Sequence, residues 1–202
     1  MKKSLFILFV LFAVKSGFAQ TAALPASEVV LKEAYAKAAK ENKKVMLIFH
    51  ASWCGWCKKM EASLADPTIK PLIDNNYVIA TLDVMERPGK ESLENPGSLQ
   101  IMTKLKGEKS GLPFWVVLDA KGKVLGDSQV RPAGASLDTY GENVGCPAST
   151  DEVAFFTKLL KATSKLNDEQ LAVIAKRFAQ NASAPAPAKA ATPTSPATVG
   201  SK

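Results

Sequence analysis

The stretch Ser52-Trp53-Cys54-Gly55-Trp56-Cys57-Lys58 directly follows the apolar run Val45 to Phe49 and holds two of the three cysteines of the chain. The apolar run predicts a buried strand, and we expect the cysteine pair at the start of the helix that follows it. Two cysteines three residues apart on a helix lie on one face, close enough to form an unstrained disulfide. The stretch therefore predicts a dithiol that opens and closes reversibly.

The two cysteines are expected to differ in reactivity. Cys54, at the helix N-terminus, would face unpaired backbone N–H groups and the positive end of the helix dipole, which stabilise a thiolate. We therefore predict that Cys54 is the attacking sulfur. Cys57, one turn further along, is predicted to stay protonated until a mixed disulfide forms and then to resolve it.

Residues 49–60, FHASWCGWCKKM, resemble the active-site segment of the thioredoxin superfamily, especially its secreted thioredoxin-like and disulfide-isomerase-like branches. A second segment, Ser110-Gly111-Leu112-Pro113-Phe114, resembles the superfamily's loop that carries a cis-proline opposite the CxxC pair. The resemblance covers roughly residues 27–166. It implies an α/β fold, a three-layer α/β/α sandwich with a mixed central sheet, and a thiol:disulfide oxidoreductase that acts on protein substrates through a Cys54–Cys57 disulfide.

The resemblance also implies a substrate-binding surface around the cysteines. It implies that Pro113 is cis and that the backbone of Leu112 is left free to pair with a substrate strand. Because they flank or separate the two cysteines, Trp53, Gly55 and Trp56 are expected to meet the substrate as well. For Trp53, simple packing is the alternative.

The sequence departs from the thioredoxin pattern at two places. Ile48 stands where thioredoxins carry a buried aspartate that helps to move the proton of the resolving thiol, and Gly55-Trp56 replaces Gly-Pro. His50, the only histidine, is a candidate proton relay because imidazole titrates near neutral pH. Glu61, one turn beyond Cys57, is a second candidate. The alternatives are a histidine with satisfied hydrogen bonds under the site and a solvated helix residue.

The first 19 residues have the features of a signal peptide. Lys2 and Lys3 are followed by the apolar run Leu5 to Val14 and by Gly17-Phe18-Ala19, a small-residue cleavage site. This run is shorter than the roughly 20 residues that a membrane-spanning helix needs, so we expect no membrane span after cleavage. Export predicts a periplasmic or secreted protein in an oxidising compartment.

The net charge of +7 does not indicate a nucleic-acid-binding protein. The predicted signal peptide carries three lysines and no acid, so its removal leaves 23 basic against 19 acidic residues. The remaining basic residues are dispersed among acidic ones, without the clustered stripe and interleaved aromatics that bind nucleic acid.

Periodicity predicts the order of the elements. We expect helices over 27–40, with Ser27 as N-cap, and over 54–64 and 97–105, with a further helical piece up to about 75. Strands are predicted over 44–50, 77–84, 113–118 and 123–127, and loops over 86–96 and 130–147. Two more helices are predicted over 150–162 and 168–179. The predicted domains are residues 1–19 (signal peptide), 20–166 (thioredoxin-like domain), 167–180 (C-terminal helix) and 181–202 (disordered Ala/Pro-rich tail).

The cysteines themselves are the expected redox group, so the sequence predicts no cofactor and no metal. Expected partners are protein thiols and disulfides and an upstream redox protein that supplies electrons, and we expect a monomer. Whether the protein works as reductase, isomerase or oxidase stays open. So does the role of Cys146, which is either a small apolar filler or an extra thiol. Two other functions remain: a module that binds a soft ion such as Cu(I) through Cys54 and Cys57, with His50 or Met60, or a redox-sensing interaction domain.

Overall fold

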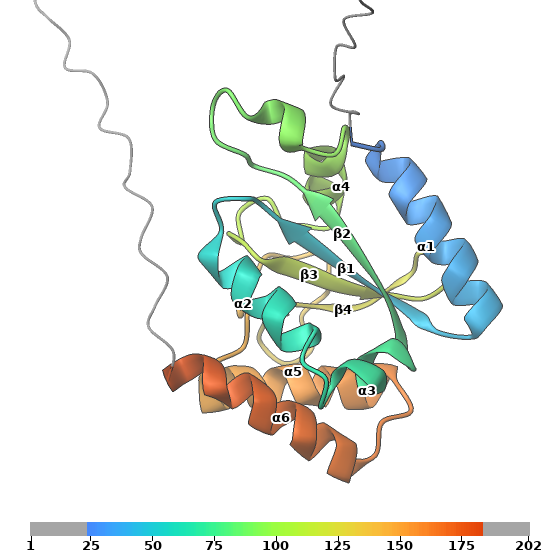
Figure 1. Ribbon diagram of the computed structural model, residues 1–202, viewed down its shortest axis with the longest axis vertical. Helices are drawn as coiled ribbons and strands as arrows, with labels where there is room; N and C mark the ends of the chain where they lie inside the picture. The colour runs from blue at the N-terminus through green and yellow to red at the C-terminus, as the bar shows by residue number, and fades with distance from the viewer. Residues whose placement is uncertain (1–23, 184–202) are drawn as a thin grey trace, which may run out of the picture.

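A computed structural model describes residues 24–183 of the 202-residue chain. Figure 1 shows a twisted central sheet with helices packed on both of its faces. The predicted signal peptide lies outside the described residues, as does the predicted tail from residue 184 onward.

The central sheet has four strands: β1 (Lys44–His50), β2 (Tyr77–Asp83), β3 (Phe114–Leu118) and β4 (Val124–Asp127). Their order across the sheet is β2-β1-β3-β4. β1 runs parallel to β2 and antiparallel to β3, and β3 is antiparallel to β4. The predicted mixed sheet is confirmed.

The alternation of side chains along β1 creates the three layers. Val45, Leu47 and Phe49 belong to one hydrophobic cluster, which includes Ala34 and Ala38 of α1 (Ser27–Glu41) and Met102 of α4 (Ser98–Lys104). Met46 and Ile48 belong to the other cluster, formed with α2 (Gly55–Leu64), α3 (Lys70–Asp74), α5 (Thr150–Thr163) and α6 (Asp168–Ser183). Because both faces of β1 are covered, the strand is apolar from Val45 to Phe49, and the predicted α/β/α sandwich is confirmed (Figure 1).

The N-cap predicted for α1 is wrong. Ala26 is the N-cap and makes no side-chain capping bond. The Ser27 side chain is buried instead, and its hydroxyl donates to the carbonyl oxygen of Pro96 at 3.0 Å. The hydroxyl of Ser27 therefore bonds to the segment that precedes α4, a tertiary contact that the local sequence pattern does not reveal.

The two C-terminal helices start where the sequence indicates. Ser149 and Glu152 form a capping box at α5. At α6 the Asn167 side chain accepts from the Gln170 N–H at 2.8 Å, and the Gln170 side chain accepts from the Asn167 N–H at 3.1 Å. These reciprocal bonds satisfy N–H groups that a helix start leaves without intrahelical partners.

Helix α6 belongs to the core and runs past residue 179, where the sequence predicts that it ends. Leu171, Ile174 and Phe178 are buried in the same cluster as α5. The helix continues to Ser183 because Asn181 is buried and its side-chain amide donates to the hydroxyl of Ser63 and the carbonyl of Pro147. Residues 181–183, expected in the tail, therefore form the last turn of α6.

Two segments predicted as loops contain short regular elements. A 3₁₀ turn, η1 (Glu91–Leu93), lies within residues 86–96. Strands β5 (Gln129–Val130) and β6 (Glu142–Asn143) pair as an antiparallel ribbon in the 130–147 region. An ion pair between Arg131 and Asp127, both nearly buried, fixes the start of the ribbon to β4. Strands of two residues are too short for their periodicity to be recognised in sequence.

Candidate active site

The cysteine pair lies at the N-terminus of α2, as the sequence predicts. Cys54 is the N-cap of the helix, and its sulfur accepts a hydrogen bond from the backbone N–H of Cys57 at 3.1 Å. The two cysteines form a disulfide, and their residues are 3 and 1 % exposed. An N–H group directed at the Cys54 sulfur is the arrangement that stabilises a thiolate after reduction.

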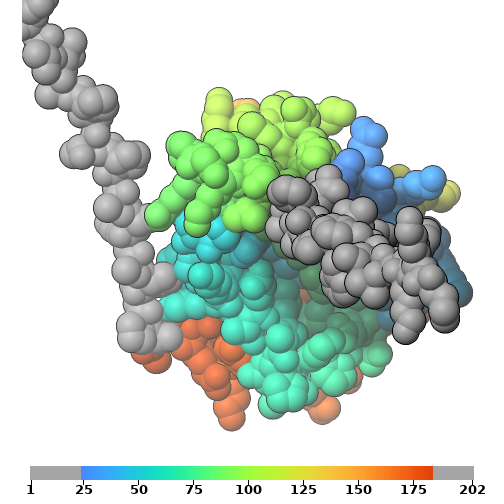
Figure 2. Space-filling view, turned by 45° about the horizontal axis from the view of Figure 1, so that its top comes forward, coloured from blue at the N-terminus to red at the C-terminus, as the bar shows by residue number. Residues whose placement is uncertain are grey.

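The turn before Cys54 is held by the segment that follows β2. The Glu86 carboxylate accepts from both the N–H and the hydroxyl of Ser52, at 2.5 and 2.8 Å. The Trp53 indole N–H donates to the carbonyl of Met85 at 2.7 Å. These bonds fix the entry to α2, and nothing in the sequence pattern singles out Met85 or Glu86. In Figure 2 the surface around α2 lies between the segment after β2 and the end of α6.

The second predicted segment lies against the disulfide. The Leu112–Pro113 peptide bond is cis, and Leu112 packs on the cluster formed by Ala51, Cys54 and Cys57. Within the described part of the chain, no backbone hydrogen bond uses the N–H or the C=O of Leu112. Both groups are therefore free to pair with an extended peptide next to the disulfide.

Asn143 of β6 is a site residue that sequence reasoning missed. Its side-chain amide donates to the carbonyls of Ser110 and Pro113, at 2.8 and 3.1 Å. Its oxygen accepts from the Ser128 hydroxyl at 2.7 Å. Asn143 thus joins the cis-proline loop to the β5–β6 ribbon. No sequence signal identifies it, because its partners are distant in the chain.

A groove of about 350 Å³ runs between the cis-proline loop and the ribbon. Its lining residues include Trp56, Leu112, Pro113, Asn143, Cys146 and Glu152. Trp56 is half-buried, packs against the two cysteines, and carries the Lys59 ammonium 4.3 Å above its ring. Trp53 is 38 % exposed on the surface. Gly55 is the first residue of α2. The structure thus brings the predicted substrate-contacting residues together around the disulfide.

His50 and Glu61, the candidate proton carriers, lie next to each other. His50 is the last residue of β1, and its Nε2 is 3.2 Å from a Glu61 carboxylate oxygen. Its Nδ1 is 2.7 Å from the carboxylate of Asp83, the residue opposite it on β2. Asp83 was not expected in this group.

Cys146 is buried in the core cluster that contains α5 and α6. Burial raises the pKa of its thiol from 9.0 to about 12. A thiol in this environment is a weak nucleophile, because the thiolate is the reactive form. The structure therefore favours the interpretation of Cys146 as a small apolar filler.

This pKa predicts a contribution to stability that depends on pH. The folded thiol stays neutral up to about pH 12, whereas an unfolded thiol ionises near pH 9.0. The contribution is therefore complete below pH 9 and is lost as pH rises towards 12, by about 1.4 kcal/mol per pH unit. Urea unfolding of the wild type and of Cys146→Ala should show the free-energy difference between them shrinking from pH 8 to pH 10. A difference that does not change with pH contradicts the burial of this thiol.

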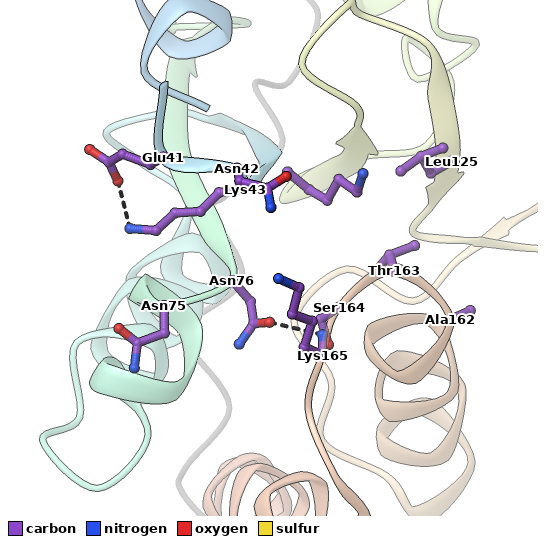
Figure 3. Close-up of a pocket in the computed structure, with 11 residues that line it drawn as sticks. Glu41, Asn42, Lys43, Asn75, Asn76, Leu125, Ala162, Thr163, Ser164 and Lys165 are labelled. Atoms are coloured by element: carbon purple, nitrogen blue, oxygen red, sulfur yellow. Dashed lines mark hydrogen bonds and ion pairs between the residues drawn. The ribbon is translucent and has the colours of Figure 1, made fainter. Parts of the chain in front are cut away.

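The pocket in Figure 3 lies where β1 and β2 begin, whereas the cysteines follow the other end of β1. It measures about 530 Å³ and is lined mainly by polar residues at the C-terminal ends of α1, α3 and α5. Lys43 pairs with Glu41, and the backbone N–H of Lys165 donates to the Asn76 side chain (Figure 3). Lysines at helix C-termini offset the negative end of the helix dipole, which accounts for their presence here. The pocket contains no residue of the predicted site.

Two further features bear on the alternatives left open by the sequence. Within residues 24–183, no group of three or more His, Cys, Asp or Glu side chains is arranged to hold a metal ion. In the same part of the chain, no helix combines the length and the apolar character needed to cross a membrane.

Comparison with known proteins gives one family and several individual matches. The family described as thioredoxin-like matches residues 28–120. A probable protein disulfide-isomerase ER-60 of Schistosoma mansoni is 33 % identical over 70 residues, which are 35 % of this chain and 14 % of that protein. The chain therefore spans only a small part of that relative.

The solved structures that are similar to the chain are more distant in sequence. A disulphide isomerase from Xylella fastidiosa Temecula1 is 20 % identical, with a TM-score of 0.44 over 84 % of this chain and 98 % of that chain. A structure described as DsbH oxidoreductase is 22 % identical, with a TM-score of 0.43 over 81 and 96 %. A thioredoxin from Thermus thermophilus is 19 % identical, with a TM-score of 0.38 over 69 and 87 %.

The family match spans the first strand, the cysteine-bearing helix and the cis-proline loop. These elements lie in a mixed four-stranded sheet covered by helices on both faces, with the disulfide at the N-terminus of α2. On this evidence residues 28–120 of the chain are similar to the thioredoxin-like family.

Proposed function

We propose that the protein is a thiol:disulfide oxidoreductase that exchanges disulfides with client proteins. The observation that carries the proposal is a disulfide at a helix N-terminus packed against a loop whose Leu112 backbone is unpaired. A purely structural disulfide does not need a loop with an unpaired backbone beside it. A disulfide that closes so small a loop also constrains the unfolded chain only weakly.

In the proposed reaction the reduced Cys54 thiolate attacks a client disulfide, and one client sulfur leaves as a thiolate. Cys57 then loses its proton and attacks the Cys54 sulfur, which restores the Cys54–Cys57 disulfide and releases the second client thiolate. The client gains two electrons and the protein loses two. Leu112 and Pro113 hold the client backbone, and Trp53, Gly55 and Trp56 contact its side chains.

We further propose that the protein acts as a monomer after export to the periplasm or the exterior, directed by residues 1–19. Cysteine is the only redox group that this reaction requires. In such a compartment the electrons for repeated reduction have to come from a partner protein, because the cytoplasmic thiol pool is not directly accessible there.

Reduction of insulin by dithiothreitol, followed by turbidity, tests the proposal. The purified protein is expected to accelerate precipitation of the insulin B chain well beyond dithiothreitol alone. No acceleration, together with tight binding of Cu(I) in a titration of the reduced protein, supports the metal-binding alternative instead. Equilibration with glutathione buffers then gives the direction of electron flow. A reduction potential of the Cys54–Cys57 pair of about −270 mV indicates a reductant, and one of about −120 mV indicates an oxidant.

A further inference from the structure

His50 lies between two carboxylates that come from different elements. Asp83 of β2 contacts its Nδ1 at 2.7 Å, and Glu61 of α2 lies 3.2 Å from its Nε2. The imidazole is mostly buried, with 15 % of the side chain exposed, whereas the Glu61 side chain is 52 % exposed. The three side chains therefore connect a buried position under the site to the surface of α2.

The contact with Asp83 determines which nitrogen accepts a proton. A carboxylate can only accept, so the neutral imidazole carries its hydrogen on Nδ1 and has its lone pair on Nε2. In the described part of the chain this Nε2 is buried and makes no hydrogen bond of good geometry, although Glu61 lies close to it. Two acceptor atoms at this distance repel unless a proton lies between them. One added proton, shared between Nε2 and the Glu61 carboxylate, therefore removes this repulsion, so the pair is suited to take up a proton.

Cys57 is the thiol that has to lose a proton in the proposed reaction. It is 1 % exposed, and a thiol in apolar surroundings ionises poorly without an acceptor nearby. Ile48, on the strand below the site, offers no acceptor. Glu61 follows Cys57 by four residues on α2, so their Cβ atoms lie about 5–6 Å apart on one face of the helix.

We propose that Glu61 and His50, with His50 held by Asp83, form the route that takes the proton of Cys57 when it resolves a mixed disulfide. The inference rests on the proposed function. The S–H bond of Cys57 breaks, its proton passes to the Glu61 carboxylate and on to Nε2, and the thiolate forms the Cys54–Cys57 bond. The client sulfur leaves with the electron pair of the mixed disulfide. Asp83 acts as a positioning residue, because it touches only His50.

Other charged groups line the same groove as the imidazole. His50 and Asp83 line a groove of about 680 Å³ together with the carboxylates of Glu86, Glu91 and Glu94. Glu86 and Glu94 already accept hydrogen bonds, from Ser52 and from the Glu86 backbone N–H. Glu91 accepts from the Gly89 N–H at 3.0 Å. Unlike these carboxylates, Glu61 lies on the helix that carries Cys57. Glu91 lines the same groove as His50, so its replacement is a matched control for the loss of one negative charge.

The attack by Cys54 and the resolution by Cys57 can be measured separately. Reduced full-length protein is mixed in a stopped-flow instrument with dithiobis(nitrobenzoate), an aromatic disulfide. Attack by Cys54 releases the first nitrobenzoate thiolate, and resolution by Cys57 releases the second. Glu61→Gln and His50→Gln are expected to leave the first release within about twofold of wild type. They should slow the second release by about 10- to 100-fold at neutral pH, the usual contribution of a general base. The defect should shrink as pH rises, because bulk solvent then removes the proton.

Control variants separate a proton route from a general effect of charge or structure. Glu91→Gln removes one carboxylate from the same groove and is expected to leave both releases unchanged. Asp83→Asn should slow the second release less than His50→Gln does. Because Glu61 is half exposed, Glu61→Gln should fold normally even if His50→Gln does not. A second release in Glu61→Gln with the rate and pH profile of wild type overturns the relay. If wild type releases neither thiolate, the proposed function itself fails.

Discussion

Replacing Cys57 with serine is expected to trap the protein in a mixed disulfide with its client, whereas replacing Cys54 with serine is expected to abolish exchange altogether. The difference follows from their positions. Cys54 caps α2 and receives the Cys57 N–H at its sulfur, so we expect it to be the nucleophile. Cys57 is buried one turn further along, and we expect it to act only on a mixed disulfide that has already formed.

Insulin turbidity and non-reducing gel electrophoresis measure the two outcomes. Cys54→Ser should reduce insulin at the rate of dithiothreitol alone and form no covalent adduct. Cys57→Ser should also lose turnover, but on a non-reducing gel it should show a mixed disulfide with insulin that dithiothreitol cleaves. Cys146→Ala is the matched control, because its thiol is buried and its pKa is raised to about 12, and it should retain wild-type turnover. Adducts formed by Cys54→Ser but not by Cys57→Ser would reverse the two assignments.

Replacing Phe178 with alanine is expected to destabilise the whole protein by about 3–5 kcal/mol, the usual cost of removing a buried phenylalanine ring. Phe178 is fully buried on α6, and its ring centroid lies 4.8 Å from that of Phe156 on α5. Trp115 of β3 packs edge-on against Phe156, 5.2 Å away between ring centroids. The loss of stability therefore affects the central sheet and is not confined to α6.

Urea unfolding followed by circular dichroism and by tryptophan fluorescence tests this expectation. Both signals should shift together to lower urea, because α6 and the sheet share one core. Val173→Ala is the control on the same helix, since Val173 is 43 % exposed and its loss should change stability by less than about 0.5 kcal/mol. A separate early transition in Phe178→Ala, with the fluorescence midpoint unchanged, would mean that α6 is an appendage.

The family match and the packing role of α6 come from different parts of the chain. Residues 28–120 alone match the thioredoxin-like family, and this part contains both segments recognised in the sequence. Helix α6 lies beyond the match, and its apolar residues at helical spacing predicted a helix but not its location. Only the packing of Leu171, Ile174 and Phe178 shows that it completes the core on one face of the sheet.

From the sequence by itself, the family resemblance of the two motifs predicted the fold class, and the cysteine pair and its strand were predictable because their signals are local. A run of five apolar residues predicts a strand covered on both faces, and CxxC after it predicts a disulfide at a helix start. The capping residues of α5 and α6 are equally local, since their side chains bond to backbone three residues away.

Only the tertiary structure decided which distant residues surround the disulfide. Glu86 reaches Ser52 across 34 positions, Asn143 reaches Pro113 across 30, and Asp83 reaches His50 across 33. Such contacts depend on strand order and register, which bring together residues whose separation along the chain carries no pattern. The same reason explains the failed prediction for Ser27: its hydroxyl had a better partner in Pro96, 69 residues away, than in its own helix.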